Sequence, residues 1–164
     1  MLHNGIQFFG DSFEAEKITV RNVMATATVA NGVYALDVTA SGGDTSGAAD
    51  PVRAAAGNIV AVSTANLGTI LVITPKPIRP GEVGEAIVRG PAKVLVNGTT
   101  DIAKGDRLKA SNGSAVLTKA SSAAGSTDIG VACAREAFTT DGDGTIKVFF
   151  DGICFNKVIN GATT

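Results

Sequence analysis

The sequence predicts an all-β fold, a small antiparallel barrel or sandwich built from hairpins, and three observations carry that prediction. Five Asn-Gly and three Asp-Gly pairs occur in the chain, and both pairs tolerate the positive φ angles of two-residue hairpin turns. Most of them lie between short runs rich in Val, Ile, Leu and Ala. Apolar residues make up 45% of the chain but aromatic ones only 5%, so the core must be aliphatic. The 164 residues fit one domain.

Residues 1–16 are expected to form an extended N-terminal arm. Three of the seven phenylalanines lie there, among polar and acidic residues that show no regular period. Burying one such ring stabilises a structure by about 1.5–3 kcal/mol, whether it folds back onto its own domain or inserts into another protein. We therefore take Ile6, Phe8, Phe9 and Phe13 as candidate partner-binding residues.

A single β domain is expected over residues 17–159. It begins with two strand-like runs, Lys17–Ala30 and Val33–Thr39, joined by the turn Asn31-Gly32 into a hairpin. The stretch Ala40–Asp50 is small and polar and predicts a long loop.

At most one short helix is expected, because Asp50 can cap and Pro51 can begin one or two helical turns. Asn58–Ser63 and Thr69–Thr74 are continuous apolar runs, which predict strands buried on both faces. Residues 74–82 contain three prolines and predict a stiff connector that separates two halves of the domain.

The pattern is most regular after Val83, where six short runs predict six strands of a compact barrel or sandwich. These runs are Gly84–Arg89, Ala92–Asn97, Asp106–Ala110, Ser114–Lys119, Asp128–Glu136 and Gly144–Asp151. A last edge strand is expected over Ile153–Ile159, and residues 160–164 are expected to form a loose tail.

Charge and hydropathy exclude some partners. The net charge of -1 argues against a general nucleic-acid binder, since neutralising phosphates takes a clustered excess of Lys and Arg. No apolar run approaches the roughly 20 residues of a membrane-spanning helix, so no membrane partner is expected. The start of the chain has no secretory pattern, and we expect the protein to be made in the cytoplasm and to work where it is made.

No metal or cofactor is expected. Cys133 and Cys154 both lie in strand-like runs and are interpreted as buried free thiols. Together with the one histidine, His3, they are too few for a structural zinc site. The stretch Asp141–Gly144 suggests a calcium loop, but Gly152 stands where an EF-hand needs its closing glutamate, so Asp-Gly turns explain it better.

Catalytic motifs are also scarce. Gly42–Gly47 is rich in glycine but lacks the Gly-Lys-Ser/Thr ending of a nucleotide-binding loop. A Ser-His-Asp triad would have to use His3, the one histidine. A residue so near the terminus is not expected to be held within hydrogen-bond reach of a nucleophile. We expect no enzyme, although a serine-lysine pair remains open.

The stretch from Val83 to Gly152 contains a recognisable series of elements. These are the strand around Val94–Val96, the turn Ile102–Asp106 with the following Arg107-Leu108, the Asn112-Gly113 hairpin, Ile129–Ala132 and the strand Gly144–Phe150. In this series the stretch resembles the capsid decoration, or cement, proteins of tailed bacteriophages. Residues 25–38, "ATATVANGVYALDV", look like the first hairpin of the same group.

The resemblance implies a non-enzymatic viral structural protein of the virion. Such a protein would bind the outer surface of a phage head as a homotrimer and stabilise it by bridging subunits of the major capsid protein. The alternative is a carbohydrate- or receptor-binding β module of a phage tail or surface structure. Such modules usually expose Trp or Tyr, whereas this chain has no Trp and one Tyr, Tyr34.

Overall fold

The computed structural model describes residues 14–37, 57–63, 70–121 and 128–153, and it confirms the all-β prediction. The described residues contain no helix. The nine strands are β1 Glu16–Asn22, β2 Gly32–Leu36, β3 Asn58–Val60, β4 Leu71–Thr74, β5 Val83–Asn97, β6 Arg107–Ala110, β7 Leu117–Lys119, β8 Gly130–Ala134 and β9 Asp143–Asp151.

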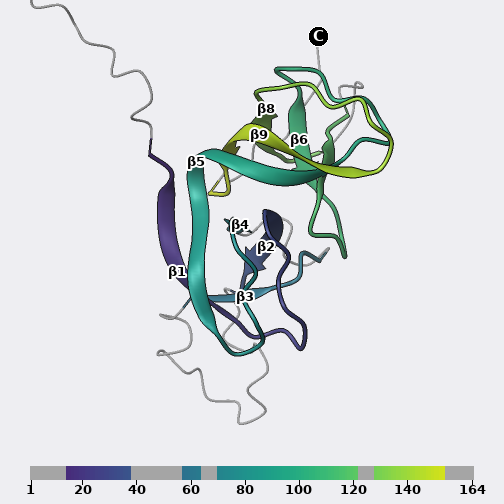
Figure 1. The fold of residues 1–164 in the computed structure, drawn as a ribbon. Helices are drawn as coiled ribbons and strands as arrows, with labels where there is room; N and C mark the ends of the chain where they lie inside the picture. The colour runs from purple at the N-terminus through teal and green to yellow at the C-terminus, as the bar shows by residue number, and fades with distance from the viewer. Residues whose placement is uncertain (1–13, 38–56, 64–69, 122–127, 154–164) are drawn as a thin grey trace, which may run out of the picture.

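The strands form two closed rings that share β5. One ring runs β1-β3-β2-β4-β5 and closes through the β1–β5 pairing, and the other runs β5-β7-β6-β8-β9 and closes through β5–β9. In Figure 1, β5 runs beside β1 and then turns to run beside β9. The β1–β3 and β5–β7 pairs are parallel, which the hairpin pattern did not predict.

The length of β5 corrects the prediction of two separate strands, Gly84–Arg89 and Ala92–Asn97, because the chain continues through the gap as one strand of 15 residues. Gly90, at the point where the strand changes partners, has a φ of 106°, a value that favours glycine. Pro91 follows at a place where pairing with β1 has ended, so its missing N–H removes no hydrogen bond to that strand.

The core is aliphatic, as predicted, and consists of two clusters. One contains Val20, Tyr34, Ile59 and Val72, inside the first ring. The other fills the second ring and also includes Val33, Ala35, Leu71 and Ile73 from β2 and β4. Successive residues of β2 and β4 thus contribute to different clusters, so these two strands form the wall of the first ring that packs against the second ring. Every residue of β4 is buried, which confirms that Thr69–Thr74 contains a strand covered on both faces.

The predicted first hairpin is wrong. Asn31 does adopt a positive φ of 60°, and Gly32 N donates to Val29 O at 3.1 Å, so the turn itself forms. However, the strand before it ends at Asn22, and β1 and β2 pair with β3 instead of with each other. Residues 23–30 form a loop whose buried Thr28 exchanges hydrogen bonds with the backbone of Ile78.

The proline-rich stretch 74–82 does not separate two halves of the domain. It joins β4 to β5, which pair antiparallel within the first ring. The buried side chain of Asn22 supports this connection, because its Nδ2 donates to Ile78 O and Thr26 O, each at 2.8 Å. The connector therefore packs against loop 23–30 and belongs to one ring.

Two turns match the sequence interpretation. Asn112-Gly113 joins β6 to β7, with Gly113 at a φ of 71°. In the turn before β6, Asp106 Oδ2 accepts a hydrogen bond from Ala103 N at 2.7 Å. The remaining predictions lie outside the described residues: loop 40–50, the helix at Pro51, the edge strand after Ile153, Cys154 and the tail 160–164.

Candidate docking surfaces

The outer face of the β5–β9 pair combines cationic and apolar side chains. Pro91 lies opposite Phe149, and Lys93 lies opposite Lys147. Both lysines are exposed, and Phe149 is 43% exposed, whereas the alternate residues of β9 point into the ring and are buried. Large exposed aromatic side chains are enriched in protein interfaces relative to the rest of the protein surface.

Strand β8 and its end extend this face. The guanidinium of Arg135 lies 5.5 Å from the centroid of the Phe149 ring, a distance at which the cation and the ring attract each other. Arg135 N also donates to Lys147 O at 2.9 Å. Cys133, opposite Phe149, is a free thiol and is half-buried, which corrects the prediction of full burial, since strand alternation turns it outward.

A groove of about 480 Å³ lies beside this face, where the two rings meet at β5. We call it the basic groove, because four of its lining residues are cationic and none is acidic. It is lined by Ala15, Lys17, Asn31, Pro75, Ile87, Pro91, Ala92, Lys93, Arg135 and Lys147.

Two of the four cations of the basic groove have carboxylate partners. Lys17 lies 3.7 Å from Glu85, and Lys147 lies 4.0 Å from Glu136. All four of these side chains are at least 43% exposed, so the pairs are weak. The groove therefore keeps most of its positive charge.

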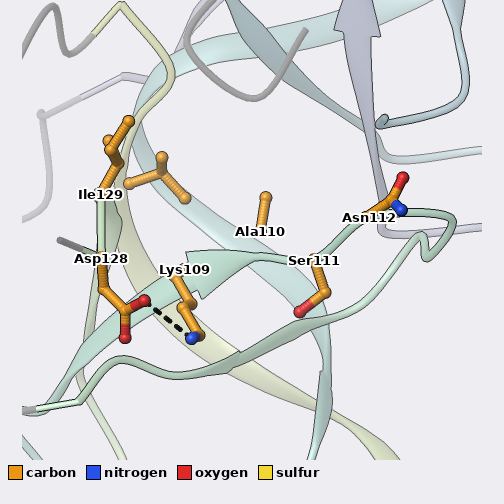
Figure 2. A pocket seen from close by; sticks show the side chains of 7 residues that line it. Lys109, Ala110, Ser111, Asn112, Asp128 and Ile129 are labelled. Carbon is orange, nitrogen blue, oxygen red and sulfur yellow. Dashed lines mark hydrogen bonds and ion pairs between the residues drawn. The ribbon is translucent and has the colours of Figure 1, made fainter. Parts of the chain in front are cut away.

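Figure 2 shows a second pocket, of about 380 Å³, at the far end of β6. The Lys109 ammonium points to Asp128 and donates to its Oδ1 at 2.8 Å. Ser111, the serine of this pocket, lies 3.3 Å from Thr118 through their hydroxyl oxygens. A serine-lysine mechanism needs a lysine nitrogen that accepts the serine proton, and here that nitrogen donates to a carboxylate.

A third cavity, of about 500 Å³, lies along the proline-rich connector. Pro75, Pro77 and Ile78 line it together with Val83, which is 53% exposed. Lys17, Lys76, Glu82 and Glu85 bring charges of both signs to it. The charges of this lining cancel, so the cavity does not favour a partner of either sign.

Tyr34 is 6% exposed and cannot serve as a flat platform for a sugar. Burial raises the pKa of its hydroxyl, and the hydrogen bond from Val29 N to the hydroxyl oxygen, at 2.7 Å, acts in the opposite direction. The ring belongs to the first core cluster. Its role is structural.

The predicted anchor residues Ile6, Phe8, Phe9 and Phe13 lie outside the described residues. The structure does describe the point where the arm joins the domain. A Cβ added to Gly90 would lie 3.0 Å from Ala15 Cα and 3.3 Å from Glu14 O, so the chain passes tightly over Gly90. The described chain therefore begins next to the basic groove, which Ala15 lines.

Sequence reasoning missed Phe149 and Arg135. The sequence did contain a signal for Phe149. Every second residue of this strand is apolar, at Ile146, Val148 and Phe150, and this alternation places Phe149 on the opposite, outer face. The position of Arg135 beside the ring depends on β8 pairing with β9, which the sequence pattern does not specify.

Within the described ranges, no three His, Cys, Asp or Glu side chains gather as metal ligands would. A search of the same ranges finds no helix that is both long and apolar enough to span a membrane.

No family model and no curated protein matches this chain. Among solved structures it is similar to the N base of head fiber gp8.5 in bacteriophage phi29, with a TM-score of 0.51 and 15% sequence identity. The match covers 85% of this chain and 97% of that one. At this identity the similarity is one of fold.

Proposed function

We propose that this chain is a non-enzymatic structural protein of a bacteriophage virion. In this proposal it binds the outer surface of the phage head and stabilises the head by bridging subunits of the major capsid protein. The observation that carries the proposal is the fold similarity, which extends over 97% of a phage head fiber base. The resemblance of residues 83–152 to decoration proteins supports the same reading independently.

The surface of the described residues is suited to binding a shell through the outer faces of its strands. Every described strand has a ladder partner on each side, so the two rings offer few free edges to an incoming strand. Contact with a shell then has to come from outer faces, such as the one around Phe149, and from the arm. An extended arm can add a strand to the sheet edge of another protein.

Stabilisation of a shell follows from mass action. A protein that binds only the assembled shell stabilises it by about 4 kcal/mol per site when its free concentration is about a thousand times its Kd. Many binding sites of moderate affinity are then enough to stabilise the shell. A homotrimer would present three arms and three faces to neighbouring subunits, and we propose that state for the attached form.

Co-sedimentation tests the proposal. Purified chain is mixed with undecorated shells of the phage that encodes it, and the pellet is analysed for both proteins. We expect the chain to pellet with the shells at a fixed ratio and to remain in the supernatant without them. If it stays in the supernatant when shells are present, the proposed function is wrong.

A further inference from the structure

We propose that the basic groove binds an acidic, extended peptide segment of a partner protein. The proposal begins with Lys93 and Lys147, which face each other directly across the β5–β9 ladder. In such pairs the Cβ atoms are about 5 Å apart, and two like charges oppose folding. This repulsion between the two lysines lowers the stability of the isolated domain, and an anionic partner bound beside them would reduce it.

Two more cations enlarge this positive region. Lys17 and Arg135 line the same groove, and no acidic side chain lines it. The part of the chain that the structure describes offers Lys93 no ion pair, and Arg135 packs on Phe149. Carboxylates that enter the groove would therefore meet cations that are already positioned by the strands.

The apolar lining favours a peptide over a nucleic acid. The cations share the lining of the groove with Ile87, Pro91, Ala92 and Pro75, so the groove can accept apolar side chains as well as charges. A phosphate backbone would need a wider excess of cations than a chain of net charge -1 supplies.

The inference rests on the proposed function only for the source of the segment, which would be an acidic stretch exposed on the major capsid protein. Binding of an acidic segment at the groove would orient the domain, since the groove is lined by Ala15, two residues after the candidate anchor Phe13 in the sequence. The arm and the groove would then contact the same shell region.

The test measures binding of a fluorescent twelve-residue peptide in which glutamate alternates with phenylalanine or serine. The groove variant is Lys93→Gln with Lys147→Gln. The matched control is Arg79→Gln with Lys104→Gln, which also removes two positive charges but from exposed residues outside the groove. We expect the groove variant to bind about tenfold more weakly than the parent and the control to bind as the parent does.

A second measurement separates lost binding from lost folding. Removing two facing lysines should leave the melting temperature unchanged or raise it, because it removes a repulsion. Equal peptide binding by the parent and the groove variant would overturn the inference. Tighter binding of the parent to a short DNA duplex than to the peptide would overturn it as well. Peptide binding by a chain that fails to sediment with shells would support the groove while refuting the proposed function.

Discussion

Leu71 N donates a hydrogen bond to Gly152 O at 2.9 Å, and this contact ties the end of β9 in one ring to the start of β4 in the other. Gly152 N donates in turn to Val88 O of the shared strand at 2.8 Å. A Cβ built on Gly152 would collide with the carbonyl of Leu71. Three strands therefore meet at a point where only glycine fits, and the two rings are held together there.

Replacing Gly152 with Ala should destabilise the domain by about 3 kcal/mol, because the added methyl group meets backbone that cannot rotate away. Gly81→Ala is the matched control, since Gly81 has a φ of 76° but open space around it, and its cost should be about 1 kcal/mol. Urea unfolding measures both. Equal losses in the two variants would show that the junction is not tightly packed.

Asn22→Ala should cost about 2–4 kcal/mol. The fully buried amide donates to Ile78 O and Thr26 O and accepts from Met24 N, so its removal breaks three hydrogen bonds and leaves a cavity beneath the connector, although Ile78 O keeps its bond from Thr28 N. Asn97→Ala provides the comparison, because the side-chain bonds of Asn97 are exposed, and its cost should stay below about 1 kcal/mol. Thermal unfolding of both variants tests this, and a small loss at Asn22 would contradict the assignment.

Stability should fall at acid pH partly because of Asp106. The hydrogen bond from Lys119, at 2.7 Å, and the one from Ala103 N lower the pKa of this carboxyl below its ordinary value of 3.8. A lowered folded-state pKa stabilises the fold above 3.8, and this contribution is lost as the pH falls through the folded-state value.

The Asp106→Asn variant should accordingly lose less stability than the parent on acidification, by about 0.5–1 kcal/mol, since the pair is partly exposed. Asp101→Asn is the matched control, because it also removes a carboxylate near Lys119, but Lys119 donates to the backbone carbonyl of Asp101 and not to its side chain. Denaturant unfolding at a series of pH values from 7 down to 3 makes the comparison. Identical pH profiles for Asp106→Asn and the parent would refute the role of this pair.

Deleting residues 1–13 should weaken attachment to shells while leaving the circular dichroism of the domain intact. The deletion stops before Glu14 and Ala15, which pack on Gly90, and it removes Ile6, Phe8, Phe9 and Phe13. A chain that keeps its length but carries serine at these four positions is the control for the loss of apolar side chains alone. Attachment of the truncated chain equal to that of the parent would remove the anchor role.

Local features of the fold were predictable from the sequence, because they depend on neighbouring residues. Asn112-Gly113 lies in the connection of the β6–β7 hairpin with Gly113 at a positive φ, and Leu71–Thr74 is buried on both faces as a continuous apolar run should be. The aliphatic composition also described the core correctly.

The partners of each strand were not predictable, because pairing depends on contacts between distant residues. Asn31-Gly32 makes its turn, but β3 separates the flanking strands in the sheet. Gly90 allows β5 to bend where the sequence suggested a break, and so one strand serves both rings. The basic groove was not predictable for the same reason, since Lys17, Lys93 and Arg135 are distant in the sequence and come together only when the rings close.

Calorimetry of undecorated shells, with and without saturating protein, tests the central claim most directly. If the protein stabilises the shell, the melting temperature of the shells will rise as the protein binds and will stop rising when the sites are filled. A melting temperature that is the same at every protein concentration would contradict the claim.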